Sequence, residues 1–102
     1  MAKVRVTFIV RPNRAIEDLY LIGSTKNLGA WDTNNASKMK YNAELNAFVI
    51  NKMFVENEAV EFKFISNKDW KYVEKGIWNE EIVNRIFVPT KGLKLNLTIE
   101  HI

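Results

Sequence analysis

The 102 residues suffice for one domain, and the hydrophobic and charged fractions of 47% and 26% are typical of a globular protein. The net charge of +3 comes from scattered lysines and arginines without a long basic run, so we expect neither nucleic acid nor a membrane as a partner. With no cysteine, the chain cannot form a disulfide scaffold or a thiolate metal site. Met1-Ala2-Lys3 leads directly into a strand pattern and predicts no signal peptide. Two cellular compartments are compatible with the sequence. The protein is cytoplasmic if this chain is the whole protein, and secreted if it is a domain of a longer secreted enzyme.

Alternation of apolar and polar residues predicts strands along most of the chain. In residues 3–10 the valines and Phe8 fall on one face, and residues 93–100 alternate leucines with polar residues in the same way. β-Branched and aromatic residues predict further strands at residues 18–23, 48–54, 60–66, 70–74 and 85–88. Turn residues separate these strands at 11–13, 29–35, 56–58, 66–69 and 89–92.

The number and spacing of these strands predict an all-β fold. About seven or eight short strands favour a two-sheet antiparallel β-sandwich of the immunoglobulin type, with a closed barrel as the alternative. No repeat or linker interrupts the pattern, so residues 1–102 are expected to form a single domain. At most one turn of helix is expected, at residues 15–19.

The residues needed for catalysis are scarce. His101 is the only histidine and lies next to the C-terminal residue, so a nucleophile would have no credible base, and a histidine metal site is excluded. Acidic residues at Glu74, Glu80 and Glu81 lie close in sequence, but adjacent acids in a loop are interpreted as solvated. We therefore expect no enzyme activity, no metal and no cofactor.

Three tryptophans and one lysine suggest a binding site. Trp31 and Trp78 lie in loops rich in turn residues, and Trp70 follows a turn, so each is either an exposed side chain or a core residue. Lys63 falls on the strand face opposite the neighbouring phenylalanines. Indoles beside a hydrogen-bond donor suit a sugar ring, which has an apolar face and a rim of hydroxyls. Asn84, with both amide functions, could bridge two such hydroxyls.

Several short motifs, in order and covering nearly the whole chain, resemble those of a known family. They are Leu21-Ile22-Gly23-Ser24, Leu28-Gly29-Ala30-Trp31-Asp32, Ala36, Met39, Glu61-Phe62-Lys63-Phe64-Ile65, Val73-Glu74 and Asn84-Arg85. Together they are similar to the family 20 carbohydrate-binding module, the starch-binding domain. The resemblance implies a β-sandwich with immunoglobulin-like topology.

The resemblance also implies a principal glucan site formed by Trp31, Lys63, Glu74 and Asn84. The chain departs from the family at Val73, where a second stacking tryptophan is usual, and in the longer stretch that follows Glu74.

Two tryptophans could replace the missing one. Trp78 lies in the lengthened loop and is favoured over Trp70, which on a regular strand would point away from the face of Val73. A strand bulge would turn Trp70 back to that face.

The family's second site usually includes a tyrosine near the position of Ala15, which this chain lacks. Tyr41 lies close to where a further aromatic of that second site is found.

The resemblance implies non-catalytic binding of α-1,4-glucans such as starch, glycogen, maltooligosaccharides and cyclodextrins. Such a module would hold an attached enzyme, for instance an amylase or glucanotransferase, near the polysaccharide, and would be monomeric as an isolated domain. The alternatives are a domain that stacks single-stranded nucleic acid on its aromatics and a protein-interaction domain.

Overall fold

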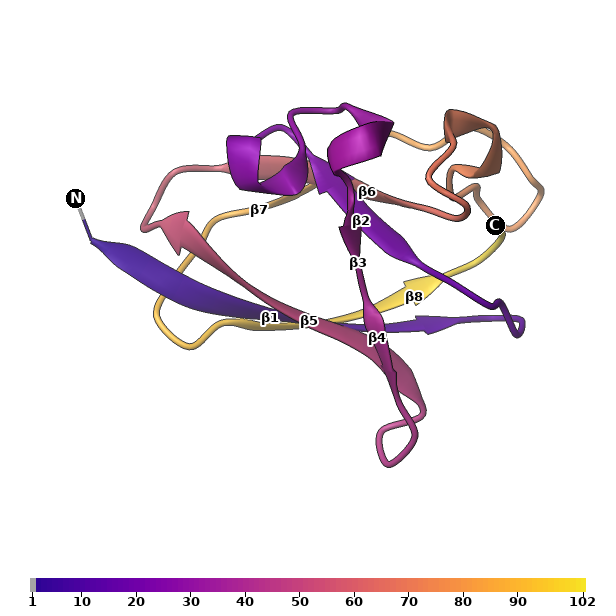
Figure 1. Cartoon of the computed structure of the whole chain (residues 1–102), viewed down its shortest axis with the longest axis horizontal. Helices are drawn as coiled ribbons and strands as arrows, with labels where there is room; N and C mark the ends of the chain where they lie inside the picture. The colour runs from indigo at the N-terminus through magenta and orange to yellow at the C-terminus, as the bar shows by residue number, and fades with distance from the viewer. Residues whose placement is uncertain (1) are drawn as a thin grey trace.

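The computed structural model describes residues 2–102, and Met1, where the predicted domain begins, lies outside them. The chain forms eight strands and three 3₁₀ helices (Figure 1). The strands are β1 (Lys3–Pro12), β2 (Tyr20–Gly23), β3 (Ser37–Lys38), β4 (Lys40–Asn42), β5 (Ala47–Val55), β6 (Val60–Ile65), β7 (Arg85–Phe87) and β8 (Lys94–Ile99). The helices are η1 (Lys26–Leu28), η2 (Thr33–Asn35) and η3 (Trp70–Tyr72). Within residues 2–102 no helix has the length and apolar character needed to cross a bilayer.

The strands form two four-stranded sheets that face each other as a β-sandwich, which confirms the predicted fold class (Figure 1). Their orders are β4-β5-β1-β8 and β3-β2-β6-β7. The pairings are antiparallel except that β1 and β8 are parallel, from Thr7–Lys94 to Pro12–Ile99. This parallel pair places the first and last of the described strands side by side in one sheet.

The core between the sheets is built by the predicted alternation. All four apolar residues of β1 that share the inner face are buried, and Phe8 is fully so. Its ring meets those of Phe54, Phe62 and Phe87 edge to face, with centroids 5.5–6.2 Å apart. Edge-to-face contacts of this kind add to the stabilisation from burial, so this aromatic cluster joins strands of both sheets.

Two segments differ from the predicted elements. Residues 70–74 form η3 and a single bridge at Val73, because Asn67 and Lys68 adopt left-handed backbone and the Asp69 carboxylate accepts the amide hydrogen of Lys71. The short strands β3 and β4 were not predicted. The chain passes from one sheet to the other between them, at the buried Met39.

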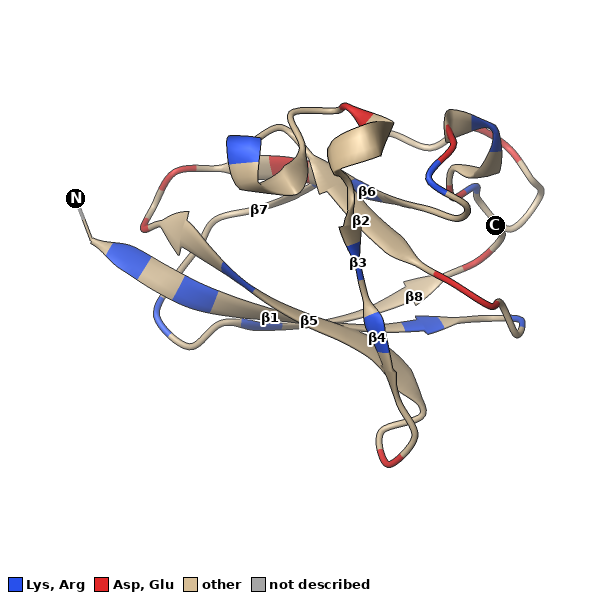
Figure 2. Ribbon diagram, viewed as in Figure 1, with Lys and Arg blue, Asp and Glu red and all other residues tan. Residues whose placement is uncertain are grey.

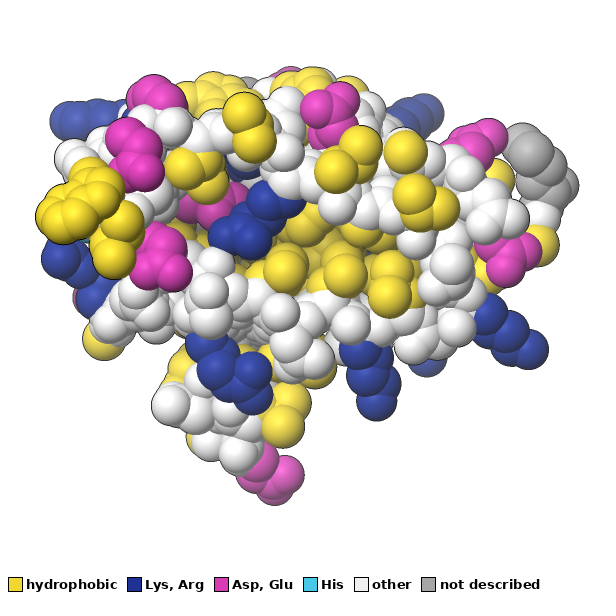
Figure 3. All heavy atoms as spheres, turned by 180° about the vertical axis from the view of Figure 1, so that it is seen from behind, with side chains coloured by type: hydrophobic (Ala, Val, Ile, Leu, Met, Phe, Trp, Pro, Cys, Tyr) yellow, Lys and Arg dark blue, Asp and Glu magenta, His cyan; other side chains and the backbone are white. Residues whose placement is uncertain are grey.

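The edges of the two sheets leave part of the core visible. The face opposite that of Figure 1 shows hydrophobic side chains in a shallow depression with a cationic side chain above them (Figure 3). The edge strands β7 and β8 do not pair, but Arg85 of β7 donates to the carbonyl of Thr98 in β8, with Nη2 2.7 Å from the oxygen. This hydrogen bond links the two sheets at their edge.

Phe8→Ala tests the aromatic core. Removing a fully buried ring leaves a cavity between three other rings, so we expect a loss of about 3–5 kcal/mol in the free energy of unfolding. Urea denaturation followed by circular dichroism measures this loss. The exposed Ile86→Ala on β7 serves as the control, and an equal effect of both substitutions would contradict the assignment of the core.

Candidate functional site

A turn of unusual backbone geometry positions Trp31. Gly29, Ala30 and Trp31 have φ values of 88°, 47° and 67°, all in the left-handed region. Gly29 is required there, since a Cβ would lie 2.8 Å from the carbonyl oxygen of Asn35. The amide of Trp31 donates to the carbonyl of Gly23 at 3.0 Å, and the turn is thereby fixed to the end of β2.

The indole of Trp31 lies on a small apolar cluster on the outer face of the second sheet. The cluster consists of the buried residues Ile22, Ile65 and Val73, against which the half-buried Tyr20, Trp31 and Ala36 pack. Trp31 is therefore neither a core residue nor fully exposed: one side of the ring is supported, and the other remains accessible.

Trp70 lies beside Trp31. It begins η3 and is 41% exposed, and the two indole centroids are 6.1 Å apart with planes inclined by 39°. The predicted strand that would point Trp70 away from this face does not exist. The structure thus brings together Trp31 and Trp70, called the tryptophan pair below.

Lys63 lies on the same outer face, as predicted. In the register of β2 and β6 it is opposite Ile22, on which the Trp31 cluster is built. Its Nζ donates to the carbonyl oxygen of Ile82 at 2.7 Å, so the side chain is half-buried beneath the loop that follows Glu74. Two of the three ammonium N–H groups remain for another acceptor.

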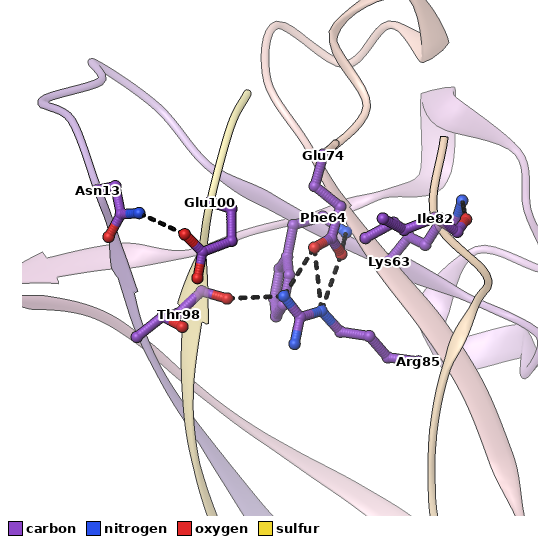
Figure 4. Close-up of polar contacts among 8 residues, drawn as sticks. All are labelled: Asn13, Lys63, Phe64, Glu74, Ile82, Arg85, Thr98 and Glu100. Carbon is purple, nitrogen blue, oxygen red and sulfur yellow. Dashed lines mark hydrogen bonds and ion pairs between the residues drawn. The ribbon is translucent and has the colours of Figure 1, made fainter. Parts of the chain in front are cut away.

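Glu74, which the resemblance implies is a residue of the glucan site, does not lie on this surface. It is 1% exposed, and its carboxylate accepts one bifurcated hydrogen bond from Nε of Arg85, with both oxygens at 3.0 Å, and a second hydrogen bond from Nη2 at 2.8 Å (Figure 4). The amide of Phe64 donates to the same carboxylate at 3.0 Å. All these contacts lie within the domain, so the side chain implied to touch ligand acts as a buried link between β6, β7 and the segment after η3.

Asn84 and Trp78 are exposed. Among the described residues, neither forms a hydrogen bond or an aromatic contact with the tryptophan pair. Asn84 Nδ2 is 3.4 Å from a carboxylate oxygen of Glu61, a long hydrogen bond. Trp78 is 84% exposed, and its amide donates to the Glu80 carboxylate at 2.8 Å. The turn therefore presents the indole of Trp78 to solvent.

An ion pair closes the same loop. Lys75 donates to the exposed carboxylate of Glu81, and this hydrogen bond, together with the lysine charge, holds the pKa of Glu81 below its usual value. The charge of Lys63 acts in the same direction. The loop that covers Lys63 is thus fixed at both its ends.

Tyr41 lies elsewhere, on β4. Its ring is 55% exposed and packs edge-on against Phe48 at 5.3 Å, and its hydroxyl donates to Asn46. With Phe48, Asn46 and residues 11–17 it lines a hollow of about 510 Å³.

Sequence reasoning missed the residues that support the site. Ile22 and Ile65 carry the indole of Trp31, the carbonyl of Ile82 fixes Lys63, and Arg85 neutralises Glu74. The isoleucines could have been found, because both fall on the outer face of their strands and yet are apolar.

An all-β sandwich with paired indoles on one sheet face is typical of a carbohydrate-binding module. A scan against protein-family models matches residues 3–97 to the starch binding domain, family 20 of these modules. The chain therefore belongs to the starch-binding domain family, as the motifs predicted. A search of curated proteins finds no match.

Solved structures share the fold. The glucoamylase of Hormoconis resinae matches with a TM-score of 0.73 and 21% identity, over 97% of this chain and 18% of its own. The family 15 glucoamylase of Hypocrea jecorina matches with a TM-score of 0.74 and 17% identity, over 96% of this chain and 17% of its own. The family 20 module of a maltotetraose-forming amylase from Pseudomonas saccharophila matches over 94% of this chain and all of its own, with a TM-score of 0.70 and 17% identity. The chain thus spans less than a fifth of the two glucoamylases.

Glu74→Ala tests the buried link. The substitution leaves the Arg85 guanidinium and the Phe64 amide without their partner, so we expect a loss of about 3–5 kcal/mol in the free energy of unfolding. Urea denaturation measures it. The control, Glu81→Ala, removes an exposed ion pair and should barely change the urea concentration at the midpoint of unfolding. If the two variants unfold at the same urea concentration, the buried pair does not hold these elements together.

Proposed function

We propose that this domain binds α-1,4-glucan chains non-catalytically on the tryptophan pair. The observation that carries the proposal is the geometry of Trp31 and Trp70, with centroids 6.1 Å apart and planes inclined by 39°. Sugar rings stack on indoles through their C–H faces. Successive α-1,4-linked glucose units are rotated relative to one another, so the polymer curves. Two inclined indole rings therefore suit this polymer better than a flat stacking surface.

Two polar side chains are proposed to complete the site: Lys63, on the outer face that carries the tryptophan pair, and Asn84, which forms no hydrogen bond with the pair in the described part of the chain. Lys63 offers two free N–H donors, and the exposed amide of Asn84 supplies both a donor and an acceptor to sugar hydroxyls. Glu74 has the supporting role of holding Arg85. Because the surface is open and desolvates little of the ligand, we expect dissociation constants on the order of micromolar to millimolar.

Trp70 is the proposed second stacking residue, the reverse of the preference drawn from the sequence. The contact between the indoles supports Trp70, whereas Trp78 lies on a turn with no aromatic neighbour among the described residues. Trp78 is proposed to contact only sugar units beyond those that lie on the pair.

The biological use proposed for this binding is to keep an attached enzyme at the surface of a polysaccharide. Two of the matching structures are glucoamylases in which the matched region is less than a fifth of the chain. Linking a weak binding module to a catalytic domain raises the effective substrate concentration. Tyr41 and its hollow are proposed as a second, separate glucan site.

Three single variants test the tryptophan pair. Trp31→Ala and Trp70→Ala should each weaken β-cyclodextrin binding by roughly 1–3 kcal/mol, by analogy with aromatic stacking on nucleobases, and Trp78→Ala should leave it nearly unchanged. Calorimetric titration measures the affinity, and circular dichroism checks that each variant is folded.

Loss of binding in Trp78→Ala alone would overturn the assignment of Trp70. Retention of all three variants on amylose resin, with elution by maltose, would place the site elsewhere. Binding that falls steeply with salt would indicate a nucleic-acid ligand instead.

Lys63→Met tests the hydrogen-bond donor while keeping an apolar stem. We expect a loss of about 1 kcal/mol in the binding free energy for maltoheptaose, the worth of a typical hydrogen bond. Calorimetry measures the change, and Lys68→Met on the neighbouring turn is the matched control. An unchanged affinity in Lys63→Met would remove this lysine from the site.

A further inference from the structure

Charge is distributed unevenly between the strands and their connections. The four strands of the first sheet carry six cationic residues and no acid, whereas eleven of the twelve acids lie outside all strands (Figure 2). The six are Lys3, Arg5, Arg11, Lys40, Lys52 and Lys94. None of them forms an ion pair within residues 2–102.

Two of these cations, Lys3 and Arg5, lie on the same face of β1 and line one hollow. It measures about 530 Å³ and lies where β1 begins and β5 ends, lined by Lys3, Arg5, Asn27, Asn51, Lys52 and Met53. The register places Arg5 opposite Met53, and Lys3 two residues further along the same strand pair. Asn27 closes the side of the hollow, with Nδ2 2.6 Å from the carbonyl oxygen of Met53.

The polar groups left free in this hollow are donors. The hydroxyl of Thr7 donates to Oδ1 of Asn51 at 2.5 Å, so the amide nitrogen of Asn51 is the function that remains. Oδ1 of Asn27 likewise accepts a hydrogen bond from the hydroxyl of Thr25. No carboxylate is among the described residues that line this hollow, and Glu58 lines a separate hollow with Lys3 and Lys26. Two unpaired cations on one strand face, Lys3 and Arg5, together with an amide donor favour an anion.

We propose that this hollow binds a phosphoryl group, as a phosphate monoester or as inorganic phosphate. A phosphate carries about −1.5 to −2 charges and three acceptor oxygens, which matches several converging donors, whereas a carboxylate would neutralise one cation. The planar guanidinium of Arg5 can donate two parallel hydrogen bonds to it. The hollow belongs to the sheet opposite the tryptophan pair, so this activity goes beyond the proposed glucan binding and does not depend on it.

The test is a titration of the ¹⁵N-labelled domain with sodium phosphate, with sodium chloride at matched ionic strength as the reference. We expect saturable shifts of the Asn51 side-chain amide and of the Arg5 signals. Arg5→Gln and Lys3→Gln should each weaken the affinity by about threefold to fivefold, the range of exposed charge interactions. Lys38→Gln, which removes the same charge from the other sheet, is the control, and β-cyclodextrin affinity should stay constant in all three variants.

The choice of probe distinguishes the source of the group. Tighter binding of glucose 6-phosphate than of inorganic phosphate would support a sugar phosphate, and equal binding would support the free ion. The proposal is overturned if phosphate gives no saturable shift, or if Lys38→Gln weakens binding as much as Arg5→Gln. It is also overturned if only vesicles of anionic phospholipid bind, since that would indicate a membrane surface.

Discussion

The buried carboxylate of Glu74 connects elements that the chain itself leaves apart. It lies between the backbone of β6 and the guanidinium of Arg85 on β7, and Arg85 reaches on to β8 of the opposite sheet (Figure 4). Taking a carboxylate out of water is unfavourable by several kcal/mol unless its charge and its lone pairs are matched. Here three N–H donors match them, from Nε and Nη2 of Arg85 and from the amide of Phe64. The guanidinium carbon Cζ also lies over the ring of Phe64, 5.4 Å from its centroid.

This link determines where the binding surface can form. Val73, the residue before Glu74, is one of the three buried residues beneath Trp31, and it directly follows η3, which carries Trp70. A shift of Glu74 would therefore move both the support of one indole and the position of the other. The positions of both indoles therefore depend on a buried charge.

The sequence allowed the sandwich to be predicted because alternation reports directly on which side of a strand faces the core, as Phe8 and its neighbours do. It failed at residues 70–74, where a left-handed pair at Asn67 and Lys68 and the Asp69 cap outweigh the β-propensity of tryptophan and tyrosine. The contact between Trp31 and Trp70 joins two loops far apart in the chain, so no spacing rule predicts it. Glu74 was assigned to the surface because a motif cannot distinguish a residue that touches ligand from one that holds its neighbours.

The parallel pairing of β1 and β8 has a mechanical consequence. Six residue pairs, from Thr7–Lys94 to Pro12–Ile99, join the first and last strands in register. A pulling force on the two ends of the domain acts along these strands in opposite directions, so it shears all their hydrogen bonds together instead of opening them one after another. A domain held between a moving tether and a solid granule would resist extension at this pair of strands.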